Sequence, residues 1–493
     1  MKHFQNFLFF WLVLTASILC GKINKSEPIF QSHDLWYEVF LGEMKAGYAH
    51  DTMSQEGGLI KSRNEMVIQI KRVGQVVEIQ AEQNTVEKLS GELVEFSTET
   101  KMAGIPMIKK GRVDGTELVV YERQFIKGKE NRYPFDPAGR MSWGLQKEVL
   151  EKGFKKAGTN YTIKIYSPDI SMRSAVPALI ELHGKKRLSH GGSQIDAYVV
   201  VITIKSEMGS VRTKSWFDDH GVALRTEMNM GGIQVSLVRV PEKKAKKMEA
   251  EVEEFLLDTV ISLGKPLSKA KKSTLFMIKS INGPWNGRLH EGPLQQVNLI
   301  SKKEVEVLVK TDALAQREVL LESKRKECLE PNPYLDSGDL LIQDLAKEAK
   351  SEETDPEKIA GRLSAFVHQY ISSKNFTVGF ASASEVARNQ AGDCTEHSVL
   401  LAALGRACNI PSRVVTGLVY TPIFKGKRHV LVYHMWTQFY LSGKWKNYDS
   451  ALGYAQCPPD RIAFSVSSLA GEDLTESMIP VMNLIQNIEV SLK

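Results

Sequence analysis

The run Gly392-Asp393-Cys394-Thr395-Glu396-His397 stands where a turn meets a helix. Its first two residues favour a turn, whereas the residues from Thr395 to Ala407 are nearly all good helix formers. The sequence therefore predicts that Cys394 lies in the first turn of a core helix. At a helix N-terminus, free N–H groups and the helix dipole stabilise negative charge by roughly 0.3–1 kcal/mol. The same groups can bind the oxyanion of a tetrahedral intermediate, and cysteine reacts as its thiolate.

Two strands are predicted after this helix, at 412–420 and 430–441, because apolar and polar residues alternate there. His434 lies in the middle of the second strand. With a period of two residues, it shares one face of that strand with Trp436 and Gln438. The second strand therefore presents an imidazole in a defined direction.

A hairpin then brings a carboxylate toward this imidazole. Ser442-Gly443 is typical of a two-residue hairpin loop, after which the chain returns from Lys444 and reaches Asp449. In this register Asp449 falls opposite Trp436, on the face of His434 and diagonally adjacent to it. A slip of one residue would send Asp449 to the other face, so the register is a strict test. A thiol, a base and an orienting carboxylate are the groups that covalent catalysis needs.

These blocks resemble the core of the transglutaminase-like superfamily over about residues 355 to 455. The similarity lies in Gly-Asp-Cys394-Thr-Glu-His, Asn-Ile410-Pro411-Ser-Arg413, His434-Met-Trp436 and Trp445-x-x-Tyr-Asp449, in the family's order and spacing. The resemblance implies a papain-like α+β fold and a triad of Cys394, His434 and Asp449. Met435 and Ser450-Ala451 depart from the residues usual in the family, and no calcium-site pattern is present.

Several other residues are candidates for the site. His397 follows Cys394 by three residues on the same helix face, which favours a supporting role. Trp436 and Gln438 could line the cleft or pack in the core, and Gln390 could offer its amide to an oxyanion. The histidines and cysteines lack the paired, closely spaced thiols of structural zinc sites, so neither a metal nor another cofactor is expected.

Length and composition indicate a modular, mostly folded chain. A chain of 493 residues suggests about two to four domains. Its net charge of +6 arises from 64 basic and 58 acidic residues, a balance that gives nucleic-acid binding no support. From about Asp34 to Val240 short alternating segments predict antiparallel β structure, interrupted by helices near 142–153 and 174–183.

A charged block after Pro241 and the prolines Pro331 and Pro333 mark the predicted boundaries. The fold class is α+β, with a large antiparallel β-rich region before a papain-like core. The predicted segments are a signal peptide at 1–21, a β-rich domain at 30–240, a linker and small β unit at 241–345, the transglutaminase-like domain at 346–470, and a tail at 471–493.

The apolar run from Phe7 to Leu19 reads as a signal peptide, with an uncleaved membrane anchor as the alternative. Export to the periplasm or cell exterior is therefore expected, with any membrane tether confined to the N-terminus. Cys20 raises the alternative of lipid attachment, although Leu19 before it is larger than such sites prefer. Four further cysteines are too few for a disulfide scaffold, but Cys328 and Cys457 could pair.

Two functional classes remain open. The first is an enzyme in which Cys394 attacks an amide carbonyl of a protein or peptide and passes the acyl group to water or an amine. Water is always present and no amine-selecting feature is visible, so hydrolysis is the favoured outcome. The second is a non-catalytic binding or scaffold protein that retains the fold. In either class, the β-rich half is predicted to bind substrate or an envelope partner.

Overall fold

A computed structural model describes residues 30–470 and 487–493, apart from 73–74, 103–104, 125–126, 207–208, 231–232, 249–259, 282, 286–288, 313–318 and 374–380. The predicted signal peptide and Cys20 lie outside the described residues. Among those described, no helix is long and apolar enough to span a membrane. Contacts divide the chain into two compact units, one ending at Glu253 and the other beginning at Glu254.

The N-terminal unit is built on one antiparallel sheet, in the order β8-β7-β6-β5-β4-β3-β2-β1-β14-β13-β12-β11-β10-β9. This confirms the predicted β-rich region. Its strands are β1 (His33–Leu41), β2 (Met44–Glu56), β3 (Leu59–Arg72), β4 (Gln75–Lys88), β5 (Leu93–Met102), β6 (Ile105–Asp114), β7 (Glu117–Gln124), β8 (Lys127–Pro134), β9 (Asn160–Ser167), β10 (Ser171–His190), β11 (Ser193–Ser206), β12 (Gly209–Phe217), β13 (Ala223–Met230) and β14 (Ile233–Arg239).

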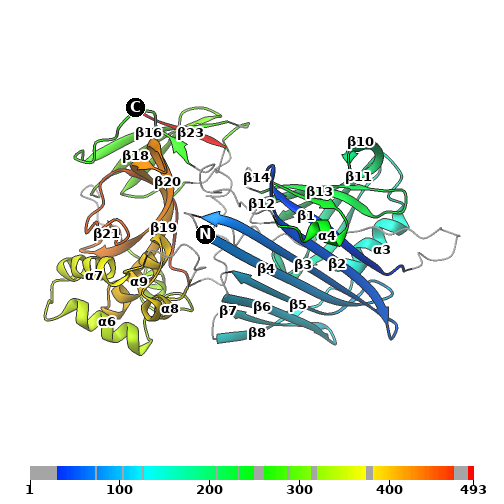
Figure 1. The fold of residues 1–493 in the computed structure, drawn as a ribbon. Helices are drawn as coiled ribbons and strands as arrows, with labels where there is room; N and C mark the ends of the chain where they lie inside the picture. The colour runs from blue at the N-terminus through cyan, green and yellow to red at the C-terminus, as the bar shows by residue number, and fades with distance from the viewer. Residues whose placement is uncertain are drawn as a thin grey trace. The chain divides into compact units, whose positions relative to one another are not determined.

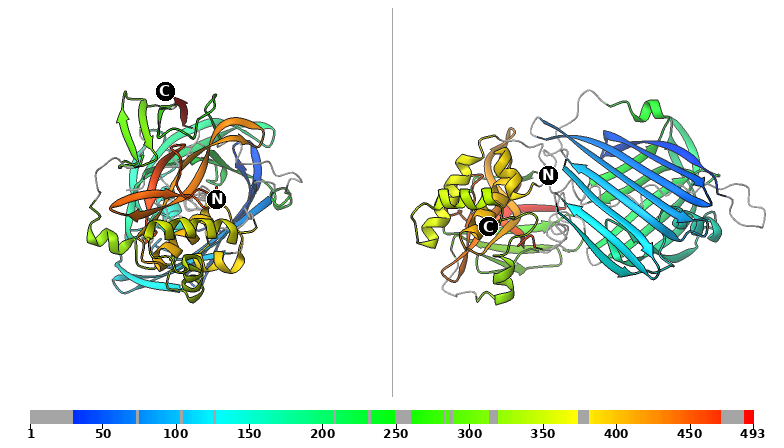
Figure 2. Two further views of the ribbon diagram at one scale, coloured as in Figure 1. Left: turned by 90° about the vertical axis from the view of Figure 1, so that its left-hand side faces the viewer. Right: turned by 90° about the horizontal axis from the view of Figure 1, so that it is seen from below.

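This sheet curls so that its two ends approach each other. In the view from below, the blue and cyan strands of its first half lie in front of the green strands of its second half (Figure 2, right). Phe96 of β5 and Leu118 of β7 share a buried cluster with Tyr166 of β9 and Met172 of β10. Lys109 of β6 also donates to the Pro168 carbonyl at 2.9 Å. Apolar side chains from distant strands therefore form one core inside the curl.

Helix α3 (Ser142–Lys152) packs within this unit and confirms the helix predicted near 142–153. The carboxylate of Glu87, which is fully buried, accepts from the N–H groups of Trp143 at 2.7 Å and Gly144 at 2.9 Å. It thus satisfies two N–H groups that the start of a helix leaves without partners.

The helix predicted near 174–183 is wrong, because this segment belongs to strand β10. Ala178, Ile180 and Leu182 are buried at alternate positions, and the strand pairs with both β9 and β11. Alanine, leucine and glutamate favour a helix here, but burial on every second residue and two neighbouring strands determine the structure.

The C-terminal unit contains two antiparallel sheets and a group of helices. One sheet has the order β15-β20-β19-β22 with β21 paired to β20, and the other has the order β17-β18-β16-β23. The strands are β15 (Ile261–Ser262), β16 (Ser273–Ser280), β17 (Gln295–Leu299), β18 (Glu304–Lys310), β19 (Ser412–Phe424), β20 (Lys427–Leu441), β21 (Lys444–Tyr448), β22 (Arg461–Ser467) and β23 (Ile488–Leu492). The helices include α5 (Glu322–Glu327), α6 (Leu340–Lys350), α7 (Pro356–Tyr370), α8 (Ala383–Asn389) and α9 (Cys394–Ala407).

Helix α9 packs between the other helices and strand β20, as Figure 1 shows. Thr437 of β20 donates its hydroxyl to the Ser398 carbonyl of α9 at 3.0 Å. A Cβ on Gly405 would lie only 2.3 Å from the Phe439 ring, so a glycine permits this close packing. The predicted arrangement of a cysteine-bearing helix on an antiparallel sheet is confirmed.

The segments predicted as a small β unit and a tail meet in the second sheet. Strand β23 pairs with β16, so that residues 488–492 complete a sheet formed by β16–β18. Phe276 and Ile278 of this sheet, together with Val490, share a buried cluster with Leu418 and Phe464 of the larger sheet. The two sheets therefore form one core.

Candidate active site

Cys394 is the first residue of α9, as predicted, and its side chain is partly exposed. Asp393 caps the helix and accepts from the Thr395 N–H at 2.8 Å, while Glu396 accepts from the Asp393 N–H at 2.9 Å. This reciprocal capping box fixes the backbone on both sides of the sulfur. The N–H of Cys394 itself has no hydrogen-bond partner among the described residues, which leaves it free to meet an oxyanion.

Gly392 is required by the same capping arrangement. A Cβ at this position would lie 2.2 Å from the Cβ of Glu396. Glu396 is completely buried, and burial, followed by the neighbouring charge of Asp393, raises its pKa well above the usual value. In the motif around Cys394, the backbone at Gly392 therefore lies against the side chain of Glu396, and the carboxyl group of Glu396 is inaccessible to solvent.

The hairpin register places Asp449 beside His434, as the sequence predicted. Leu441 pairs with Lys444, and Thr437 pairs with Tyr448. His434 Nε2 lies 2.8 Å from Asp449 Oδ2, and these side chains are only 8% and 1% exposed. The structure therefore brings an imidazole and a carboxylate together within a nearly dry environment.

His434 also meets the sulfur of Cys394, to which it is hydrogen bonded. Burial by itself would lower the pKa of His434. The charges of Asp449 and Cys394, together with hydrogen bonds to both, outweigh burial and raise the pKa to about 10. At neutral pH the imidazole is accordingly protonated and lies between two acceptors.

Arg461, at the start of β22, completes the surroundings of Asp449. Its Nη1 lies 2.9 Å from the same Oδ2 atom that binds His434, and its side chain is 1% exposed. Burial opposes ionisation of Asp449, but His434 and Arg461, through their charges and hydrogen bonds, hold its pKa well below the usual range. The sequence interpretation missed Arg461, whose only signal is a charged residue opening an apolar strand.

A row of alternating charges continues from Arg461. Its Nε donates to Asp460 Oδ1 at 3.2 Å, and Lys269 Nζ lies 3.5 Å from Asp460 Oδ2. Lys269 also donates to the Tyr454 hydroxyl at 2.6 Å. The pair Asp460-Arg461 is essentially inaccessible to solvent, whereas the side chain of Lys269 is 36% exposed. The row therefore leads from the imidazole to the surface of the unit.

His397 lies on α9 and is 5% exposed. Its Nδ1 has no hydrogen-bond partner, and burial, the largest effect, lowers its pKa to about 4 despite the nearby charge of Asp449. Its carbonyl accepts from the Ser450 hydroxyl at 3.3 Å, and the Ser450 carbonyl is bound by His368 Nδ1 at 2.7 Å. His397 thus contributes a neutral ring and a contact to the residue after Asp449.

Trp436 and Gln438 lie on the face of His434 but are buried in the protein. Trp436 Nε1 and Gln438 Nε2 both donate to Asn447 Oδ1, at 3.0 and 2.9 Å. Gln438 Oε1 also accepts from Arg413 at 2.7 Å. The polar groups of both side chains thus have their hydrogen-bond partners inside the unit. Trp436 and Gln438 therefore support the site from the core and do not line a cleft. Asn447 is a further member of this network that the sequence interpretation missed.

Gln390 ends α8 in a left-handed conformation with φ of 50°, and it is exposed. Its backbone carbonyl accepts from the Ser373 N–H at 3.3 Å, just before the turn that leads to Cys394. A role of its amide toward an oxyanion stays a prediction.

Cys328, Cys394, Cys408 and Cys457 are all free thiols, so the structure does not form the disulfide considered between Cys328 and Cys457. Within the described residues, no group of three or more histidine, cysteine or acidic side chains is placed to hold a metal ion.

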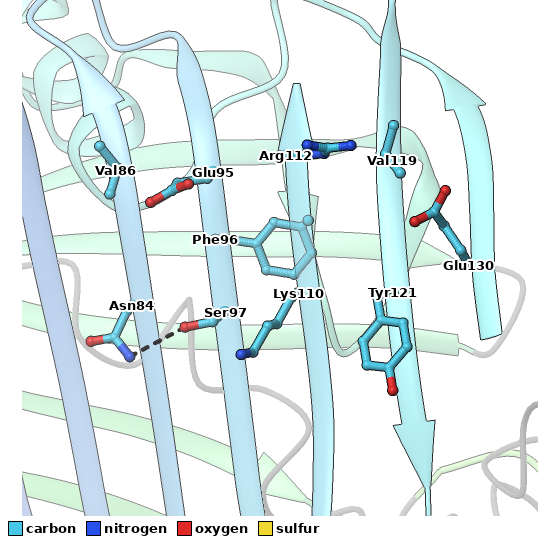
Figure 3. Close-up of a pocket in the computed structure, with 11 residues that line it drawn as sticks. Asn84, Val86, Glu95, Phe96, Ser97, Lys110, Arg112, Val119, Tyr121 and Glu130 are labelled. Atoms are coloured by element: carbon cyan, nitrogen blue, oxygen red, sulfur yellow. Dashed lines mark hydrogen bonds between the residues drawn. The ribbon is translucent and has the colours of Figure 1, made fainter. Parts of the chain in front are cut away.

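The N-terminal unit carries a separate hollow of about 380 Å³ across β4–β8. Charged side chains, including Glu95, Lys110, Arg112 and Glu130, surround it together with Tyr121 (Figure 3). Neither a cysteine nor a histidine is among the residues that line it.

Comparison with known proteins supports the interpretation of the C-terminal unit. Residues 343–450 match the transglutaminase-like superfamily, which confirms the predicted resemblance. No curated protein matches the sequence. Two solved structures show distant similarity: a proposed cysteine protease from Cytophaga hutchinsonii (13% identity, 47% of this chain and 82% of that chain, TM-score 0.28) and the periplasmic domain of TgpA from Pseudomonas aeruginosa (14% identity, 44% and 77%, TM-score 0.29).

Proposed function

This chain carries a transglutaminase-like domain at residues 343–450, and from that premise we propose that it is a thiol-dependent amide-bond hydrolase or acyltransferase. In this proposal Cys394 is the nucleophile, His434 is the acid and base, and Asp449 orients the imidazole. The observation that carries it is the position of His434, which is hydrogen bonded to Cys394 on one side and to Asp449 on the other. That is the arrangement by which a base activates a nucleophilic cysteine.

In the first step the Cys394 sulfur attacks the carbonyl carbon of a protein or peptide amide. The free N–H of Cys394 and the helix dipole stabilise the oxyanion that forms. The protonated His434 gives its proton to the leaving nitrogen, the C–N bond breaks, and a thioester and a free amine result. A histidine whose pKa is raised to about 10 carries this proton at neutral pH.

In the second step an acceptor attacks the thioester, His434 takes its proton, and the C–S bond breaks. Water gives a carboxylic acid, whereas an amine gives a new amide. We favour water, since it is always present and no amine-selecting feature is evident in the sequence. Asp449 holds the imidazole in one orientation through both steps by accepting a hydrogen bond from its Nε2–H group.

The alternative is a non-catalytic binding protein that retains the fold. Against it stands the combination of a partly exposed thiol with a nearly buried acid–base pair. A scaffold has no need for an imidazole held between a sulfur and a carboxylate. We also propose that the protein acts outside the cytoplasm, which rests on the apolar run from Phe7 to Leu19.

The proposal is tested by incubating the full chain with a peptide and amide library, with and without a primary amine. Release of peptide, ammonia or a cross-linked product is followed by mass spectrometry. Cys394→Ala should abolish every product and leave the thermal melt unchanged. Cys408→Ala is the matched control, because Cys408 caps the other end of the same helix and should retain activity.

The reactivity of the thiols gives a second, substrate-free test. Iodoacetamide should modify Cys394 faster than Cys328, Cys408 or Cys457, because burial raises the pKa of each of those three thiols. Labelling of Cys394 at the same rate as Cys408, together with no product from the library, would favour the scaffold.

A further inference from the structure

Arg461 lies outside the residues that match the family, yet it binds the carboxylate at the centre of the site. We propose that Arg461 is a positioning residue, which keeps Asp449 ionised and immobile so that His434 remains a charged partner of Cys394. This inference deepens the proposed function and rests on it. Arg461 touches neither His434 nor Cys394 by any hydrogen bond in the described structure, and so it acts through Asp449.

The two oxygens of Asp449 are both held. Oδ2 receives His434 Nε2 at 2.8 Å and Arg461 Nη1 at 2.9 Å, while Oδ1 receives the Leu452 N–H at 3.1 Å. The Asp449 N–H is also bound to the Tyr454 carbonyl at 2.9 Å. A carboxylate with partners on both oxygens cannot rotate without breaking a charged hydrogen bond. The imidazole is thereby fixed in the direction of the sulfur.

Arg461 is itself anchored in a second direction. Its Nε binds Asp460 at 3.2 Å, and its guanidinium lies over the Trp436 ring at 5.2 Å from the ring centre. Lys269 neutralises part of the remaining charge on Asp460. One buried arginine between two buried aspartates is a costly arrangement unless all the charges are paired. Arg461 is paired with the carboxylate that binds the imidazole, which assigns this buried charge a role at the site.

Other titratable groups also face this carboxylate. His434 and Arg461 act on this carboxylate directly, and its charge in turn acts on His397 of α9 and on Cys457 before β22. His397 also lies near the charges of His368 and Asp393, and Cys457 lies near that of Asp460. Among the groups bound directly to Asp449, Arg461 alone stays positive at every accessible pH. Without it, the buried carboxylate keeps a single charged partner.

The pH dependence of Cys394 alkylation measures this role without a substrate. In the wild type, Asp449 remains ionised far below neutral pH. When Arg461 is replaced by Met, the pKa of the buried Asp449 must rise, so it takes up a proton as the pH falls and ceases to accept from His434. The alkylation rate falls at low pH, and this fall is called the acid limb. In the variant the acid limb should lie at a pH higher by about one unit or more. At a given pH on that limb, the rate should then be about tenfold lower than in the wild type.

The experiment compares wild type, Arg461→Met, Arg461→Lys and a control, with iodoacetamide labelling of Cys394 followed by mass spectrometry between pH 4 and 9. Arg461→Lys keeps the charge and should restore much of the acid limb. The control is Arg406→Met. Arg406 is also buried, but it binds the carbonyls of Glu330, Ser412 and Ser468 and no carboxylate of the site. Its loss should lower stability and leave the acid limb in place.

An acid limb that is the same in Arg461→Met and the wild type would overturn the inference. An equal movement in Arg461→Met and Arg406→Met would overturn it too, because general loosening would then explain both. If Arg461→Met does not fold, Arg461→Gln replaces it, since Gln retains an N–H donor but loses the charge. Failure of the proposed function looks different: wild-type Cys394 would react no faster than Cys408 at any pH.

Discussion

Replacing Asp449 by Asn should deprotonate His434 at neutral pH. Asn has the same shape as Asp but carries no charge, so His434 loses its strongest attractive partner. In the wild type the pKa of His434 is raised to about 10 against the opposing effect of burial. In the variant, burial dominates, and we expect the pKa of His434 to fall to its ordinary value of 6.5 or lower.

The magnitude follows from these two pKa values. The difference between 6.5 and about 10 corresponds to about 5 kcal/mol favouring protonated His434 in the folded state. This is a net value, because Asp449 and Cys394 raise the pKa of His434 while burial lowers it. A raised histidine pKa adds stability that is fully present below about pH 6.5 and is lost as the pH rises through about 10. The wild type should therefore lose unfolding free energy over that window, and the variant should not.

Carbon-13 labelling of the histidine rings permits a direct test by NMR titration of the full chain. The His434 signal is assigned by its disappearance in His434→Gln. Asp460→Asn is a matched control. Asp460 is as buried as Asp449, but it binds Arg461 and has no hydrogen bond to His434. We expect His434 to stay protonated at pH 8 in the wild type and in Asp460→Asn, and to be neutral in Asp449→Asn. A wild-type His434 that titrates near 6.5 would refute the reasoning.

Three further predictions concern packing and the N-terminal unit. Gly417→Ala should destabilise the C-terminal unit by about 1–3 kcal/mol or more, since its Cβ would lie 1.9 Å from the Ile462 carbonyl oxygen; Gly361→Ala, in open space on α7, should instead be neutral or stabilising in urea denaturation. Glu87→Ala should cost about 1–3 kcal/mol in the same assay, because the N–H of Trp143 loses its buried acceptor. Removing the N-terminal unit should change the preference for members of the peptide library, and an unchanged preference would exclude a substrate-binding role for that unit.

The sequence was sufficient for two parts of the candidate site, the helix start at Cys394 and the pairing of His434 with Asp449, because these steps are local. A turn followed by helix formers sets the start of α9, and a two-residue loop sets the pairing of β20 with β21. Since side chains alternate along a strand, the loop alone determines that Asp449 joins the face of His434. Short-range rules thus place the thiol at the start of a helix and the carboxylate beside the imidazole, whereas the meeting of Cys394 with His434 was implied by the family resemblance.

The missed features depend on contacts between distant segments. Arg461 reaches Asp449 only because β22 lies beside β19, and nothing near it in the sequence indicates that neighbour. The segment 174–183 has helix-forming residues, but two neighbouring strands make it part of β10. Propensity describes a chain in isolation, whereas these elements obtain their structure from their partners.

The pairing of β23 with β16 has a consequence for biosynthesis. The two strands are separated by about 200 residues, and Ile488 and Val490 belong to the buried cluster that joins both sheets of the C-terminal unit. While the ribosome is still making residues 488–492, β16 has an open edge and this core is unfinished. The segment that carries Cys394 therefore emerges before the core shared by the two sheets is complete, so the C-terminal unit can finish folding only after residues 488–492 have been made.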